Sequence, residues 1–68
     1  MTETPISQRE NQVLQLIAAE KTSCEISQIL CISIETTRSH RKNIMLKLRA
    51  KNSAGLIRRA FEIGLLHI

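Results

Sequence analysis

Residues 22–48 read TSCEISQILCISIETTRSHRKNIMLKL, and two helix starts lie within this stretch. The first, Thr22–Glu25, has the T-x-x-E form of a capping box, in which both side chains accept hydrogen bonds from backbone amides at the helix start. Apolar residues then recur at helical spacing, so a short helix is expected over about 23–30. The turn Cys31–Ser33 breaks this pattern, and its serine can cap a second helix over about 34–48. A helix, a three-residue turn and another helix form a helix-turn-helix.

A further helix is expected before this unit. The sequence Ser7–Glu10 has the S-x-x-E form of a capping box, and the helix that it opens is expected to end near Ala19. Residues 1–5 are polar and contain the single proline, so they are expected to be a disordered or linker lead-in. Residues 6–68 then form one domain with one small core.

A fourth helix is expected after the helix-turn-helix. Either Asn52 or Ser53 can cap it, and it is expected to run over about 53–63 and to stop at Gly64. Residues at three- and four-residue steps are expected to face the core: Ile57, Ala60, Phe61 and Gly64. The predicted fold is all-α, a four-helix bundle built around a helix-turn-helix.

The charge is divided unevenly along the chain. Residues 1–35 have a net charge of −3, whereas residues 36–68 have a net charge of +7. The one aromatic residue, Phe61, cannot form the stacking platforms that bind single-stranded nucleic acid, so double-stranded DNA is the expected partner. An enzyme is not expected, because the sequence has no paired carboxylates, no nucleophile with a base and no phosphate loop.

The helix over 34–48 is expected to have two different sides. Its core side carries Thr37, Ile44 and Leu48. Its outward face is basic and nearly free of acid, and carries Glu35, Arg38, Ser39, Lys42 and Leu46. Cations gathered in this way bind DNA phosphates without sequence preference.

No cofactor, metal ion or membrane is expected. Cys24 and Cys31 would lie about 10 Å apart on a continuous helix, beyond disulfide reach, so they are expected to be reduced, half-buried packing residues. A metal site that combines them with His40 and His67 would lack the C-x-x-C or H-x-x-x-H pair typical of zinc sites. The chain start lacks a signal-peptide pattern and no apolar run approaches the ~18 residues of a membrane span, so a cytoplasmic protein is expected.

An ordered series of motifs runs without a gap from residue 6 to residue 66. It consists of Ile6-Ser7-Gln8-Arg9-Glu10, Val13-Leu14-Gln15-Leu16-Ile17-Ala18, Glu25-Ile26, Leu30-Cys31-Ile32-Ser33, Thr36-Thr37-Arg38-Ser39-His40, Asn43-Ile44, Lys47-Leu48 and Gly64-Leu65-Leu66. This series resembles the LuxR/GerE-type helix-turn-helix domain.

The resemblance implies a four-helix domain of a bacterial transcription regulator. Such a domain is usually the output half of a two-component response regulator or of a quorum-sensing regulator, and some members stand alone. Its third helix touches base edges, and its last helix forms a homodimer on near-palindromic DNA. A receiver or sensor domain belongs to the protein if the chain is a fragment, and RNA polymerase is left open as a further partner.

Base contacts are expected from the first half of the third helix. Arg38 and Lys42 are one turn apart and can reach guanine O6 and N7, while Ser39 between them can touch either kind of base. Glu35 either accepts a hydrogen bond from cytosine N4 or repels phosphate and so restricts the positions that the helix can take along the DNA. Both interpretations stay open.

Phosphate contacts are expected around this face and at the start of the helix over 23–30, where free amides and the helix dipole attract anions. The candidates are Thr22, Ser23, Thr36, His40, Arg41, Asn43 and Lys47. Simple capping is the alternative for Thr22 and Ser23, and a local hydrogen bond is the alternative for His40.

The dimer contact is expected on the last helix. Its candidates are Leu56, Arg59, Ala60 and Ile63, with ordinary core packing as an equal alternative. Glu20 stands where the family commonly ends its first helix with Gly, so a different helix end is expected there.

Two other functions stay open at this stage. One is the promoter-reading domain of a sigma factor, although the motif from Thr36 to His40 and the ending Gly64-Leu65 favour the LuxR type. The other is an anti-activator, a helical protein-interaction module that keeps the fold but does not bind DNA.

Overall fold

The computed structural model describes residues 6–66, which contain four helices and no strand. The helices are α1 (Gln8–Ala18), α2 (Ser23–Leu30), α3 (Ile34–Lys47) and α4 (Ser53–Glu62). The predicted all-α, four-helix fold is confirmed, and the predicted helix ends differ from the observed ones by one residue at most. The predicted lead-in over residues 1–5 lies outside the described residues.

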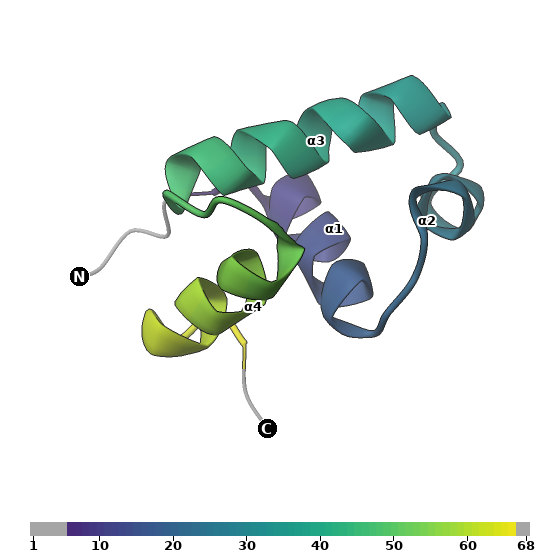
Figure 1. The fold of residues 1–68 in the computed structure, drawn as a ribbon. Helices are drawn as coiled ribbons and strands as arrows, with labels where there is room; N and C mark the ends of the chain where they lie inside the picture. The colour runs from purple at the N-terminus through teal and green to yellow at the C-terminus, as the bar shows by residue number, and fades with distance from the viewer. Residues whose placement is uncertain (1–5, 67–68) are drawn as a thin grey trace.

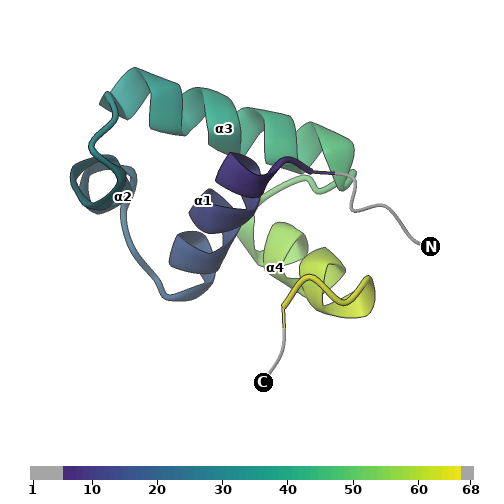
Figure 2. The same ribbon diagram turned by 180° about the vertical axis from the view of Figure 1, so that it is seen from behind.

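Helix α1 occupies the centre of the fold and contacts each of the other three helices. Helix α3 lies across it, with α2 near one end of α3 and α4 near the other (Figures 1 and 2). The core is almost entirely aliphatic and draws on all four helices and both flanking segments: Ile6, Val13, Leu14, Ile17, Ile26, Ile44, Leu48, Leu56, Ala60 and Leu66. No helix within residues 6–66 has both the length and the apolar character needed to cross a membrane.

A side chain caps the start of every helix. Ser7 and Thr22 form the two predicted capping boxes, in which Glu10 and Glu25 accept hydrogen bonds from the backbone amides of Ser7 and Thr22 at 2.8 and 2.9 Å. Ser33 accepts from the Thr36 amide at the start of α3, as predicted. At the start of α4, the cap is Asn52, the first of the two candidates.

All four helices end in the same way, with a residue in the left-handed conformation. These residues are Glu20 (φ 63°), Cys31 (φ 56°), Arg49 (φ 57°) and Gly64 (φ 83°). After each of them, an amide donates to a carbonyl five residues earlier, as Lys21 does to Leu16 at 3.0 Å and Leu65 does to Ala60 at 2.8 Å. The prediction that Gly64 ends the last helix is confirmed.

The expectation of a different end for α1 is wrong, because Glu20 adopts the left-handed conformation that glycine usually takes. A side chain with a Cβ is strained in this conformation, by about 1–2 kcal/mol relative to the right-handed region. The strain is tolerated here because this conformation turns the chain so that the amides of Glu20 and Lys21 donate to carbonyl oxygens in the last turn of α1.

We expect Glu20→Gly to raise the free energy of unfolding by about 0.5 to 1 kcal/mol, since the relief of strain exceeds the greater entropy of glycine in the unfolded chain. Gly64→Ala should lower it by about 1 kcal/mol; a Cβ there meets no atom within 4 Å, so backbone strain alone would act. Urea denaturation followed by circular dichroism measures both. Equal effects of the same sign would contradict this account of the helix ends.

Candidate nucleic-acid interface

Helix α3 has the two sides that the sequence predicted. Thr37 and Ile44 are completely buried and Leu48 is 3% exposed, so this side packs into the core. The five residues of the predicted outward face are all exposed: Glu35, Arg38, Ser39, Lys42 and Leu46. These five residues form the outward face of α3.

The polar side chain on the buried side of α3, Thr37, has a hydrogen-bond partner. The Thr37 hydroxyl is completely buried and donates to the Ser33 carbonyl oxygen at 3.2 Å. No buried side-chain nitrogen or oxygen within the described part of the chain is left without a hydrogen-bond partner. Helix α3 is therefore held in one orientation without a polar penalty in the core.

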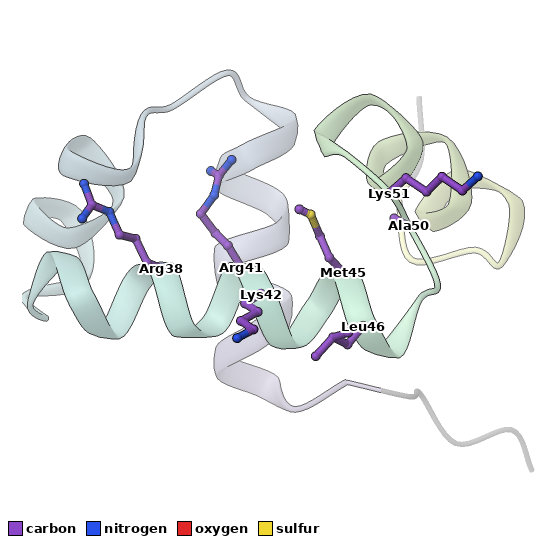
Figure 3. Close-up of a pocket in the computed structure, with 7 residues that line it drawn as sticks. All are labelled: Arg38, Arg41, Lys42, Met45, Leu46, Ala50 and Lys51. Atoms are coloured by element: carbon purple, nitrogen blue, oxygen red, sulfur yellow. The ribbon is translucent and has the colours of Figure 1, made fainter.

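A groove of about 400 Å³ lies beside the outward face (Figure 3). It is lined by residues of α3 and of the connector to α4: Arg38, Arg41, Lys42, Met45, Leu46, Ala50 and Lys51. Four of these residues are cations and none is an acid. The groove therefore attracts anions, and its lining extends the basic surface from α3 onto the connector.

The cations differ in the partners that they have within the protein. The side chains of Arg38 and Lys42 make no hydrogen bond or ion pair with any residue in the range 6–66, so their charged ends are available to a ligand. The guanidinium of Arg41 donates to the Ser53 hydroxyl at 3.2 Å, which links α3 to the first residue of α4. Arg41 is therefore positioned by the protein, whereas Arg38 and Lys42 are free to adapt.

The other predicted phosphate contacts lie at or near the surface. Ser23, His40 and Arg41 are partly buried, whereas Thr22, Thr36, Asn43 and Lys47 are exposed. The capping alternative holds for Thr22, whose hydroxyl accepts from the Glu25 amide at 3.1 Å. The hydroxyls of Thr36 and Ser33 lie 2.8 Å apart and share a hydrogen bond. These bonds fix the side chains without removing them from the surface.

Lys47 differs from the other cations because it forms an ion pair with Glu10. Its Nζ lies 2.8 Å and 3.0 Å from the two carboxylate oxygens. The Glu10 side chain is 6% exposed and the Lys47 side chain is 45% exposed, so the lysine covers the acid and still reaches solvent. Sequence patterns could not find this pair, because its members are 37 residues apart and come from different helices.

The ion pair changes the titration of Glu10. Burial alone would raise the pKa of this carboxyl, but hydrogen bonds donated by Lys47 Nζ and by the Ser7 amide outweigh it and hold the pKa below its ordinary value. The charged form of Glu10 therefore stabilises the folded protein. This contribution is fully present above the ordinary pKa of 4.5 and is lost as the pH falls through the lower pKa of the folded state.

The predicted dimer residues on α4 need a correction. Leu56 is 1% exposed and Ala60 is completely buried, because this side of α4 packs on the core between α1 and α3. The alternative of core packing therefore holds for Leu56, and the prediction that Ala60 faces the core is confirmed, so neither side chain is exposed for a dimer contact. Arg59 and Ile63 are exposed, and so is Phe61, which was expected to face the core and is instead 42% exposed.

The two cysteines are free, as predicted, but both are exposed. The expectation of half-buried packing is wrong for Cys24 and Cys31, because the apolar contacts of α2 with the core come from Ile26, which is completely buried, and from Leu30, which is partly buried. His67, the last member of the disfavoured metal set, lies outside the described residues.

Comparisons with known proteins agree on one family. Residues 4–60 match the luxR family of bacterial regulatory proteins. The chain is 41% identical to the transcriptional regulatory protein MctR of Rhizobium johnstonii over 61 residues. These residues are 90% of this chain and 28% of MctR. It is 40% identical to the uncharacterized response regulatory protein YgeK of Escherichia coli over 63 residues. These residues are 93% of this chain and 43% of YgeK. The solved structure of the transcription factor GerE matches 96% of this chain and 97% of its own with a TM-score of 0.89 at 28% identity.

Fold and site together define a helix-turn-helix domain that binds DNA in transcription regulation. The family match covers most of the chain, and the structural match covers nearly all of it. The chain belongs to the luxR family of bacterial regulatory proteins. It spans less than half the length of MctR and YgeK.

We expect Lys47→Ala to lower the free energy of unfolding by about 1 to 2 kcal/mol at pH 7, because it leaves the buried Glu10 carboxylate without its partner. The loss should shrink as the pH falls below 4.5, where Glu10 becomes protonated in the variant and then in the wild type. Urea denaturation between pH 7 and pH 3.5 measures this. The control is Lys42→Ala, which should leave stability nearly unchanged; a loss for Lys47→Ala that did not depend on pH would contradict the ion-pair explanation.

Proposed function

We propose that this domain recognises specific DNA sequences by placing α3 in the major groove with its outward face against the base edges. The observation that carries this proposal is the exposure of Arg38 and Lys42, which have no partner in residues 6–66. An α-helix fits the major groove of B-DNA, and arginine and lysine can donate to guanine O6 and N7 there. Ser39 contributes a further base contact between them.

Glu35 stands at the start of the same exposed face, so it either accepts from cytosine N4 or narrows the register by repelling phosphate. We assign the phosphate contacts to the side chains that surround this face and to the start of α2: Thr22, Ser23, Thr36, His40, Arg41, Asn43 and Lys47. The groove of Figure 3 supports adding Lys51 of the connector.

We also propose that the domain acts as a homodimer on a near-palindromic site in the bacterial cytoplasm, as a non-enzymatic regulator of transcription. The exposed residues Phe61, Ile63 and Arg59 of the α4 region support a self-association surface at the end of the molecule away from α2 (Figure 1). The names of the relatives support a transcriptional role, and the short coverage of those relatives supports a receiver or sensor domain in the complete protein. RNA polymerase remains a candidate partner.

The base-reading role predicts different effects for two arginines of α3. Arg38→Ala should weaken binding to the best site by about 1 to 3 kcal/mol and relax the preference at one base position. Arg41→Ala should weaken binding to all sequences alike. It should also reduce the slope of log affinity against log salt concentration by about one, because one counterion fewer is released on binding. Selection from a random duplex pool, followed by titration of the best site and its single-base variants, tests both.

An equal loss on every sequence for Arg38→Ala would refute its base contact. A gel shift with random duplex at low salt also separates the main proposal from the anti-activator alternative, in which DNA would not bind at all.

The dimer proposal predicts that Ile63→Asp abolishes self-association on DNA while the fold is kept, because Ile63 is 41% exposed and follows the last residue of α4. Sedimentation velocity with and without a palindromic duplex measures this, and circular dichroism checks the fold. Ile29→Asp is a matched control on α2, where the aliphatic side chain is 52% exposed. A wild-type protein that stays monomeric both free and on DNA would rule the homodimer out.

A further inference from the structure

We propose that Leu46 is a specificity-determining residue that contacts the C5-methyl group of a thymine in the major groove. The inference rests on the proposed function, since it requires α3 to lie in that groove. It assigns a sequence-reading role to an apolar residue in the second half of α3, beyond the polar residues assigned above.

The position of Leu46 is the first observation. Leu46 is 67% exposed, more than Ile29, Phe61 and Ile63, the other exposed large hydrophobic residues in the described part of the chain. It follows Lys42 by four residues and Ser39 by seven, so helical geometry puts the three side chains on one stripe of α3. An aliphatic side chain therefore stands in line with the residues proposed to read bases.

The surroundings of Leu46 are the second observation. With Met45 and Ala50 it forms the apolar part of the groove lining, and cations of α3 and the connector complete that lining (Figure 3). Lys42 and Leu46 line the groove together and lie next to each other on α3 in the figure. A ligand that suits this surface is strongly anionic and also presents a small apolar group.

The major groove of DNA has both properties. Its phosphates match Arg41 and Lys51, its guanine edges match Arg38 and Lys42, and the thymine C5-methyl is the apolar group that it presents on a base edge. An apolar protein surface lacks the required charge, because the cations would lose water without gaining anionic partners. Charge complementarity therefore favours duplex DNA as the occupant.

The geometry also predicts where the thymine lies. One turn of helix from Lys42 to Leu46 advances about 6 Å along the axis. Base pairs are spaced about 3.4 Å apart along the duplex. An α3 parallel to the duplex axis would span about two base pairs over this distance and an inclined one fewer, so the thymine should lie within about two base pairs of the pair that Lys42 contacts, on the side away from the base read by Arg38.

Replacing a thymidine of the DNA by deoxyuridine tests the inference, because this change deletes only the C5-methyl group of the base. Bound duplexes are first selected with the wild-type chain, and the base pair read by Lys42 is located as the position whose preference Lys42→Ala removes. Each thymine of the selected site is then replaced by deoxyuridine in turn. Affinities are measured for the wild type, for Leu46→Ala and for the control Ile29→Ala, which changes an exposed aliphatic residue on α2.

For one thymine at the expected position, we expect deoxyuridine to weaken wild-type binding about threefold to fivefold, the effect of one buried methyl-sized group. The same replacement should weaken Leu46→Ala less than twofold and should weaken Ile29→Ala as much as the wild type. Because Leu46 is largely exposed, its truncation should leave the circular dichroism spectrum unchanged.

Two results would overturn the inference while the proposed function stands. One is a selected site without a thymine at that position, and the other is a deoxyuridine effect that is equally large in Leu46→Ala. If instead no duplex bound, or if binding did not depend on Arg38 or Lys42, the proposed function itself would fall and the role of Leu46 with it.

Discussion

The lengthwise division of α3 into a buried side and a charged side is the constraint on which the structure depends. A 14-residue helix with four cations and one acid would be at best marginally stable alone, because like charges one turn apart repel and short helices rarely persist in water. Burial of Thr37 and Ile44 against the rest of the core supplies the missing stability. The cations can then stay together on the surface, where a polyanion gains from all of them at once.

Local hydrogen bonds make this arrangement rigid where it meets the proposed ligand. The starts of α2 and α3 are capped by Thr22 and Ser33, and the turn between the helices reverses through Cys31 in the left-handed conformation. The candidate phosphate contacts at these starts are therefore ordered before any ligand arrives. Such ordering lowers the entropic cost of binding.

The Glu10–Lys47 pair links this local order to the core. Glu10 completes the capping box of α1 and also receives Lys47 from the last turn of α3, so one carboxylate joins the start of one helix to the end of another. The remaining cations of α3 keep their charges for the ligand. Arg38 and Lys42 take no part in this ion pair, so it stabilises the fold without occupying the two cations proposed to read bases.

The sequence by itself determined the features that arise within three to five residues. Hydrogen bonds and apolar spacing along one segment determine the capping boxes, the helix lengths, the three-residue turn and the two sides of α3. These predictions are confirmed.

Only the tertiary structure decided which side of α4 is buried, which cation pairs with Glu10 and how the connector extends the groove. The physical reason is that α4 carries apolar residues on more than one side, so its own sequence is consistent with several orientations. Packing on α1 and α3 selects the one that buries Leu56 and Ala60, and contacts between distant segments have no periodicity that a single segment could reveal.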